Sequence, residues 1–212
     1  MKAILAAAAL LISVCAFART PEERLFDAIE SGKQLVAEGM VVKGGVNLDA
    51  RNGLRETALH RAIEKGYREL AELLVKAGAP LGARSANGET PLHYAALYPD
   101  PFFLDLLLAA HADLKARNDD GESVLQWAVM SGNARAAKEL LERGADWKAT
   151  DLKGNTLLHA AADGGYTEMA RALISLGVDP RQRNRAGQRP IDIARELGYA
   201  DMVELLARFE KE

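Results

Sequence analysis

Apolar residues follow a pattern that repeats every 33 residues along most of this chain. In each period, one apolar group lies two, five and six residues after a Thr or Ser, and a second group follows a few residues later. Both groups have the spacing of a buried helix face, so each period predicts two short helices. The first group comprises Leu59, Ala62 and Ile63; Leu92, Ala95 and Ala96; Leu125, Ala128 and Val129; and Leu158, Ala161 and Ala162. The second comprises Leu70, Ala71 and Leu74; Phe103, Leu104 and Leu107; Ala136, Ala137 and Leu140; and Met169, Ala170 and Leu173.

A short phrase opens each predicted first helix. It reads Thr-Ala-Leu-His at 57–60, Thr-Pro-Leu-His at 90–93, Ser-Val-Leu-Gln at 123–126, Thr-Leu-Leu-His at 156–159 and, in degraded form, Arg-Pro-Ile-Asp at 189–192. Glycines recur at three other positions of the same period, as is typical of turns and helix ends that need positive φ. This pattern predicts a stack of similar units, each too small to bury its own apolar faces.

The repeated unit resembles the ankyrin repeat. Residues 88–96, Gly-Glu-Thr-Pro-Leu-His-Tyr-Ala-Ala, are close to the family consensus, and residues 141–146, Leu-Glu-Arg-Gly-Ala-Asp, match the end of its second helix. The resemblance implies an all-α solenoid in which a β-hairpin finger precedes two antiparallel helices. On this register, residues 19–212 form six units: a divergent cap at 21–46, repeats at 47–79, 80–112, 113–145 and 146–178, and a second divergent cap at 179–212.

Several positions depart from this pattern. Arg55 stands where a glycine is expected, so we expect the first finger to be reshaped around Gly53. Pro99 replaces a glycine between two helices and should end the first of them. His111 replaces a glycine at a helix C-terminus. Trp147 takes a turn position that is leucine in the two preceding repeats, so we expect it in the core.

Residues 1–18 differ in composition from the rest of the chain. Lys2 precedes an apolar run that extends to Val14, and Ala16-Phe17-Ala18 has small residues on both sides of a large one. These features are typical of a secretory signal peptide, so we expect cleavage after Ala18 and a periplasmic protein. An uncleaved anchor is the alternative, although the run is shorter than the roughly 20 residues of a membrane helix.

Composition narrows the classes of function. The only cysteine, Cys15, lies in this leader, so residues 19–212 contain no thiol for a disulfide, a nucleophile or a metal site. The net charge is −3 and no basic block is present. Neither nucleic acid nor, after cleavage, a membrane surface is expected as a partner. We expect a monomer with no cofactor and no metal.

His60, His93 and His159 occupy one position of the turn phrase. Neighbouring helices pack about 8–10 Å apart, whereas zinc needs ligands at about 2 Å, so one ion cannot bridge these histidines. The resemblance implies instead that they hydrogen-bond neighbouring turns. His159 and Asp163 share one predicted helix, but no nucleophile or oxyanion site accompanies them, so we predict no catalytic residue.

Charged residues recur in the predicted fingers. Arginines lie six residues before the turn position, and glutamates lie one residue before it. Both can form a ladder of exposed ion pairs, each contributing about 0–1 kcal/mol. We expect them to be solvated finger charges, and a dedicated anion site is the alternative. The arginines are Arg51, Arg84, Arg117 and Arg183, and the glutamates are Glu56, Glu89 and Glu122.

The most informative variable positions lie four, seven and eight residues after the turn threonine. In ankyrin proteins these positions face the groove of the stack. The two middle repeats place large apolar and aromatic residues there, which are residue types that dominate interface energies. The alternative is that Tyr94 and Trp127 only form the groove wall. The predicted partner-binding residues, including a polar rim of finger tips, are Tyr94, Leu97, Tyr98, Trp127, Met130, Asn87, Asp119, Asp120 and Lys153.

These expectations together predict a non-enzymatic module that binds a protein partner. Exported proteins of this type resemble accessory factors that protect or support a periplasmic enzyme, and they also resemble immunity proteins that neutralise a toxin. An enzyme is a further class, but an open solenoid offers little of the pocket that catalysis needs. A cytosolic or membrane-tethered adaptor is a last alternative.

Overall fold

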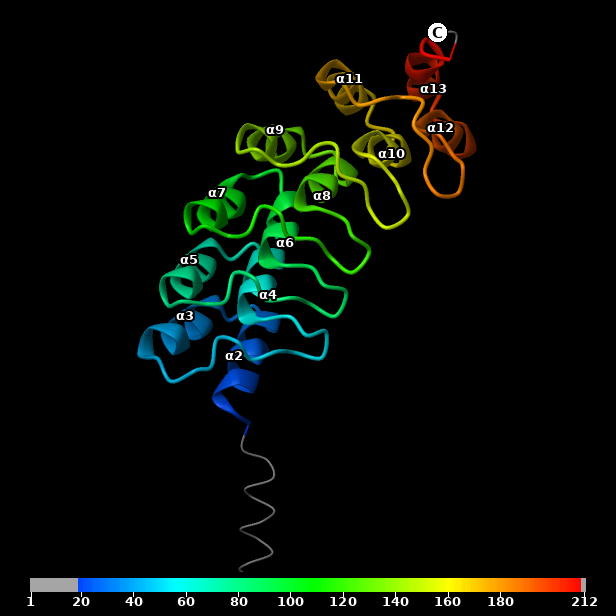
Figure 1. Cartoon of the computed structure of the whole chain (residues 1–212). Coiled ribbons are helices and arrows are strands. Elements are labelled where there is room, and N and C mark those ends of the chain that lie inside the picture. Colours follow the sequence, from blue (N-terminus) through cyan, green and yellow to red (C-terminus); the bar gives the residue numbers. More distant parts are fainter. Residues whose placement is uncertain (1–18, 211–212) are drawn as a thin grey trace, which may run out of the picture.

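Twelve helices make up the part of the chain that the structure describes, residues 19–210. The structure is a computed structural model, and the predicted leader at 1–18 lies outside the described residues. The helices form successive antiparallel pairs, and the loops that join the pairs project to one side of the stack (Figure 1). The predicted all-α solenoid is confirmed.

The pairs align into two rows. First helices contact the first helices of neighbouring units along the whole stack, so they form a continuous inner row. The inner row comprises α2 (Pro21–Glu30), α4 (Ala58–Glu64), α6 (Pro91–Leu97), α8 (Val124–Met130), α10 (Leu157–Asp163) and α12 (Pro190–Leu197). The outer row comprises α3 (Gln34–Lys43), α5 (Arg68–Lys76), α7 (Phe102–Ala109), α9 (Ala134–Glu142), α11 (Thr167–Leu176) and α13 (Ala200–Ala207).

The core lies between neighbouring pairs. Every residue of the two predicted apolar groups is buried except Met169, which is half-buried. Trp147 is also half-buried and packs against the core, which agrees with its predicted place there, and the Lys148 ammonium lies 5.1 Å from its ring centroid. In the last unit Arg195 is exposed and pairs with Glu210 at 2.8 Å. A charged residue is tolerated there because the stack ends in a soluble cap.

The turn phrase joins each inner helix to the next unit. The backbone N–H of Thr57 donates to Nδ1 of His60 (3.1 Å), and Nε2 of His60 lies 3.2 Å from the carbonyl oxygen of Glu89. Because Nδ1 accepts, Nε2 carries the proton and the ring is neutral. The predicted structural role of the histidines is confirmed. The corresponding pairs are His93 with Glu122 (3.3 Å), Gln126 with Asn155 (3.3 Å) and His159 with Gln188 (3.0 Å).

Main-chain hydrogen bonds connect the fingers. The finger of repeat 80–112 is closed by the N–H of Ser85, which donates to the carbonyl oxygen of Glu89 (2.9 Å). Each later finger also donates one N–H to the finger before it, as Ala86 does to the carbonyl oxygen of Leu54 (2.8 Å). Within residues 19–210 the fingers contain no strand and only one isolated bridge, so the expected β-hairpins are short closed loops instead.

Two residues adopt the backbone conformation of the glycines that they replace. Arg55 has a φ of 59° and His111 a φ of 64°, both in the left-handed region. The expected reshaping around Gly53 is therefore wrong, because Arg55 itself supplies the positive φ. Pro99 lies between the end of α6 and the start of α7, as expected of a residue that cannot continue a helix.

Leu107 is fully buried on α7. Its replacement by alanine should lower the free energy of unfolding by about 2–5 kcal/mol, because it removes buried methyl groups and leaves a cavity. Urea denaturation of the chain from residue 19 measures this loss. The control is Leu176→Ala, at a side chain that is 40% exposed on α11, which should cost well under about 1 kcal/mol. Equal losses at both positions would contradict burial between units as the source of stability.

Burial lowers the pKa of His60, His93 and His159 below the ordinary 6.5, in His93 to about 4. The unfolded chain then binds more protons than the folded one, so the free energy of unfolding should fall as the pH falls from about 6.5 towards about 4. For His93 alone the full loss is on the order of 3 kcal/mol.

Chemical denaturation at several pH values between about 7 and about 4.5 tests this dependence. The triple variant H60Q/H93Q/H159Q copies the natural Gln126 and should show a flatter slope over that range. Identical slopes in the two proteins would show that the histidines are not the groups that titrate.

Candidate functional site

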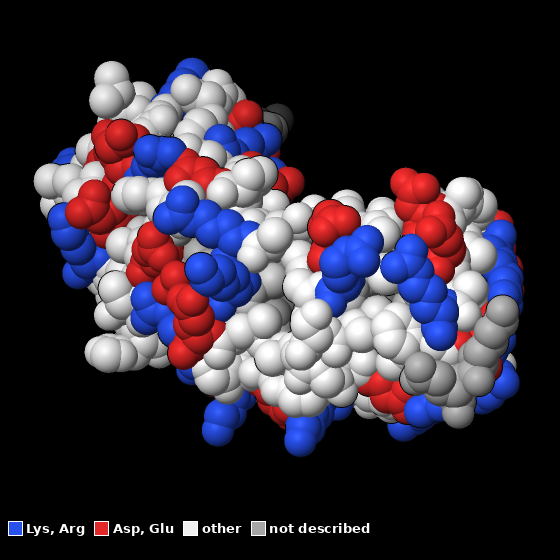
Figure 2. Space-filling view, turned by 90° about the horizontal axis from the view of Figure 1, so that it is seen from above, with Lys and Arg blue, Asp and Glu red and all other residues white. Residues whose placement is uncertain are grey.

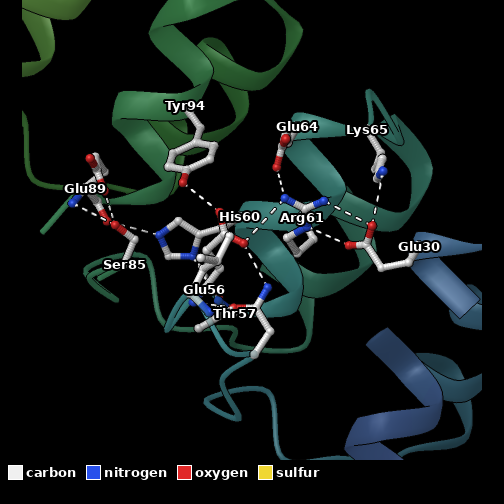
Figure 3. A network of polar contacts seen from close by, with 12 residues as sticks. Glu30, Glu56, Thr57, His60, Arg61, Glu64, Lys65, Ser85, Glu89 and Tyr94 are labelled. Carbon is white, nitrogen blue, oxygen red and sulfur yellow. Dashed lines mark hydrogen bonds and ion pairs between the residues drawn. The ribbon is translucent and has the colours of Figure 1, made fainter. Parts of the chain in front are cut away.

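The inner helices and the finger loops together form one surface, here called the groove face. Its N-terminal part is occupied by an ion-pair network centred on Arg61 of α4 (Figure 3). The Arg61 guanidinium lies 2.7 Å from Glu30 and 3.4 Å from Glu56, and it also pairs with Glu64. Lys65 lies 3.1 Å from Glu30. The network contains three carboxylates and two cations, so both cations are paired and this part of the face keeps a net charge of −1.

The finger glutamates do not form the expected exposed ladder. Glu56 and Glu89 are only 3% and 7% exposed. The Glu56 carboxylate accepts hydrogen bonds from the Asn52 amide (2.8 Å) and from the Tyr94 hydroxyl (2.7 Å), and Glu89 accepts one from Ser85. A buried carboxylate needs such donors, so these glutamates fix the loops and the groove wall.

The finger arginines bond to backbone carbonyl groups of the following finger, not to the glutamates. The series runs from Arg51 to the carbonyl oxygen of Arg84 (2.6 Å), from Arg84 to that of Arg117 (2.7 Å) and from Arg117 to that of Thr150 (3.0 Å). It stops at Thr150, which stands where the other fingers have arginine. The junction between the last two fingers therefore lacks the bond from an arginine side chain to a carbonyl oxygen.

The aromatic residues of the predicted site are half-buried and bonded within the chain. The indole N–H of Trp127 donates to Glu122 (2.9 Å), as the Tyr94 hydroxyl does to Glu56. The ring centroids of Tyr94 and Trp127 lie 6.1 Å apart. Burial raises the pKa of the Tyr94 hydroxyl, and its bond to Glu56 raises it further, so the hydroxyl stays a donor. These contacts fit the alternative in which both rings form the groove wall.

Most of the other predicted partner-binding residues are more exposed than Tyr94 and Trp127. Leu97 and Met130 are 41% and 42% exposed. Tyr98 is half-buried, and its hydroxyl donates to the carbonyl oxygen of Glu64. The finger-tip residues are exposed, and one of them is paired with Arg84. These tips are Asn87, Asp119, Asp120 and Lys153, of which Asp119 is the paired one.

A recess in the groove face lies two units further towards the C-terminus than the predicted centre between Tyr94 and Trp127. It has a volume of about 610 Å³ and is lined by the last two fingers, α12 and Asp163 of α10. A second recess of about 180 Å³ shares Lys153 and Ile193 with it and extends to Met130. The two recesses are called the C-terminal groove below. The second exists because Ala160 stands where the middle repeats have Tyr94 and Trp127.

Most residues that line the C-terminal groove were missed by sequence reasoning. Ile193, Glu196 and Leu197 occupy the same three variable positions after the degraded turn phrase of the last unit. Extending the 33-residue register into the cap would have found them. The polar side chains of the finger wall have no such signal. They are Lys153, Asn155, Asn184, Arg185 and Gln188.

Among residues 19–210, no group of three or more His, Cys, Asp or Glu is placed to hold a metal ion. The ring nitrogens of His159 contact Thr156 and the carbonyl oxygen of Gln188, so the histidine has no free nitrogen to act as a base with Asp163. In the same range, no helix is long and apolar enough to cross a membrane.

Comparison with known proteins agrees with the architecture. The family model described as ankyrin repeats (3 copies) matches residues 25–118, 77–151, 99–184 and 125–212. These overlapping matches extend from the first helical pair to the end of the chain. No curated protein matches the chain in sequence.

Solved structures share the fold. The crystal structure of the ankyrin repeat domain of Bcl-3, described as a unique member of the IkappaB protein family, is 32% identical, with a TM-score of 0.71 over 91% of this chain and 86% of that chain. In all, 598 chains of known structure match, so the fold alone does not indicate a partner. Because the family model matches repeatedly along the chain and the Bcl-3 structure has the same stack of repeats, the chain belongs to the ankyrin-repeat family.

Proposed function

We propose that this protein is a non-enzymatic binding module of the periplasm that holds a protein partner in its groove face and thereby supports or protects that partner. The observation that carries the proposal is the C-terminal groove. Met130, Leu152 and Leu197 are 42%, 56% and 49% exposed in or beside a recess, although most large apolar residues of the stack are covered. Apolar side chains gathered at a recess mark an interaction site.

The chemistry of the groove favours binding over catalysis. Its polar lining consists of amides, two cations and carboxylates, and its one histidine, His159, is engaged in the turn. A hydrolase of the common types would need a nucleophile paired with a base. The ankyrin-repeat fold supports the same conclusion, because such repeats are interaction modules.

The proposed periplasmic location is inferred from the leader. Residues 1–18 have the charged start, short apolar run and small-residue cleavage motif of a secretory signal, and no cysteine follows Cys15. A chain without thiols suits an oxidising compartment. The accessory role and the immunity role share this placement, and they differ in affinity: neutralising a toxin requires very tight binding, whereas an accessory factor can bind more weakly.

Affinity capture from periplasmic extract, followed by measurement of the dissociation constant, tests the binding role. Met130→Ala should weaken binding of the captured protein by about 1–2 kcal/mol without changing the free energy of unfolding. Leu35→Ala is the control, because Leu35 is 83% exposed on α3 and does not line the groove. Equal binding by wild type and Met130→Ala, or the absence of any captured protein, would count against the groove as the binding surface.

N-terminal sequencing of the protein from fractionated cells tests the compartment. The periplasmic protein should begin at Arg19. The double variant A16L/A18L places bulky residues at the cleavage motif and should leave an unprocessed chain in the membrane fraction. A wild-type chain that keeps residues 1–18 in the cytosol would contradict the assignment.

A further inference from the structure

The finger wall of the C-terminal groove carries positive charge that no carboxylate of the described chain neutralises. Lys153 and Arg185 line the recess, and neither forms an ion pair within residues 19–210. The two recesses are also lined by the carboxylates of Asp163, Glu196, Glu122 and Asp151. Glu196 accepts hydrogen bonds from the Gln188 amide (3.1 and 3.2 Å), Asp151 from Asn155 and Glu122 from Trp127, and none of the four forms an ion pair with Lys153 or Arg185. The two cations are therefore available to an incoming anion.

Two other cations of the groove face are paired, whereas Arg55 and Arg117 of the earlier fingers form no ion pair within residues 19–210. Arg61 lies among carboxylates, and Arg84 pairs with Asp119 at 2.6 Å. Acidic and basic side chains likewise lie next to one another over the face shown in Figure 2. The last finger is different in composition, because residues 179–189 contain four arginines and one aspartate. Arg183 in this finger also lacks a carboxylate partner in the described part of the chain. The finger therefore carries a second unpaired cation besides Arg185.

The floor of the same groove is apolar. Ile193 and Leu197 reach it from α12, and Leu152 borders it from the finger. Leu197 is 49% exposed and Leu152 is 56% exposed, so covering them would remove apolar surface from water. The groove thus combines a cationic wall with an aliphatic floor.

The size of the groove suits a short segment of polypeptide and not a folded domain. Recesses of about 610 and 180 Å³ admit a few side chains and cannot enclose a folded domain. The bordering fingers are held together by the N–H of Arg185, which donates to the carbonyl oxygen of Lys153 (2.8 Å). In an extended segment, successive side chains point to opposite sides, so one set can face the finger wall while the other faces α12.

We propose that the C-terminal groove binds an extended segment of the partner protein whose Asp or Glu side chains pair with Lys153 and Arg185 and whose aliphatic side chains pack on Ile193 and Leu197. This inference rests on the proposed binding function and adds the chemistry of the bound segment. Charge-assisted hydrogen bonds between the partner carboxylates and the two cations supply specificity, and burial of the aliphatic side chains supplies affinity.

Selection from a displayed library of random peptides tests the chemistry without knowledge of the partner. Each peptide has about 12 residues and spans about 40 Å when extended. The target is the chain from residue 19. Enriched peptides should contain Asp or Glu together with Leu, Ile or Val. Fluorescence anisotropy of labelled, enriched peptides then gives dissociation constants, which should rise several-fold with added salt because the contacts are between charges.

The double variant K153E/R185E should bind the enriched peptides at least about 10-fold more weakly than wild type. Peptides whose acidic residues are replaced by lysine should show the opposite preference. The matched control is K76E/K138E, which makes the same change in net charge at exposed lysines of the outer helices α5 and α9. Thermal unfolding of both variants verifies that the stack is intact.

Enrichment of peptides without acidic residues, failure to enrich any peptide, or unchanged affinity in K153E/R185E would overturn the inference. Partner capture separates this failure from failure of the proposed function. If the captured protein depends on Met130 but not on Lys153 and Arg185, the inference is wrong and the binding function stands. If no periplasmic protein is captured at all, the binding function itself is wrong.

Discussion

The structure depends on one contact that each of the four full repeats makes with the next unit: a turn side chain reaches a carbonyl oxygen at the end of the following finger. His60, His93, Gln126 and His159 all make it, over distances of 3.0–3.3 Å. The contact fixes the spacing of the units, which brings the alanine-rich faces of the inner helices together and excludes water from them. The parallel series of finger bonds and the groove face follow from that spacing.

Features that repeat within a unit could be predicted from the sequence, because their causes are local. The helices and the buried apolar groups follow from the period itself, whereas the role of the turn histidines was implied by the resemblance to the ankyrin repeat. The finger glutamates could not be predicted in this way. Glu56 is buried because the hydroxyl of Tyr94, in the next unit, reaches its carboxylate. No local pattern states which side chain of another unit arrives at a given position. Arg55 shows a related limit, since its positive φ accompanies the closure of its own finger, in which its N–H donates to the carbonyl oxygen of Asn52 (2.9 Å).

The groove was only partly predictable, because a recess is defined by side chains that are small. Ala160 follows Trp127 in the same register and leaves the space that the larger residue fills in the preceding repeat. The floor residues Ile193 and Leu197 obey the register and were in principle readable from it. The finger wall was not, because it depends on how two loops lie against each other.

The position of the groove coincides with a change in how the fingers are joined. The first three fingers each contain an arginine whose side chain bonds to a carbonyl oxygen of the next finger. Thr150 takes the place of this arginine in the fourth finger and ends the series. Between the last two fingers an amide pair takes over, with Asn184 donating to Asn155 at 2.8 Å. A neutral amide bond holds these loops together without using a cation. Lys153 and Arg185 lie at this junction, which borders the recess of about 610 Å³, and the side chains of neither form an ion pair within residues 19–210.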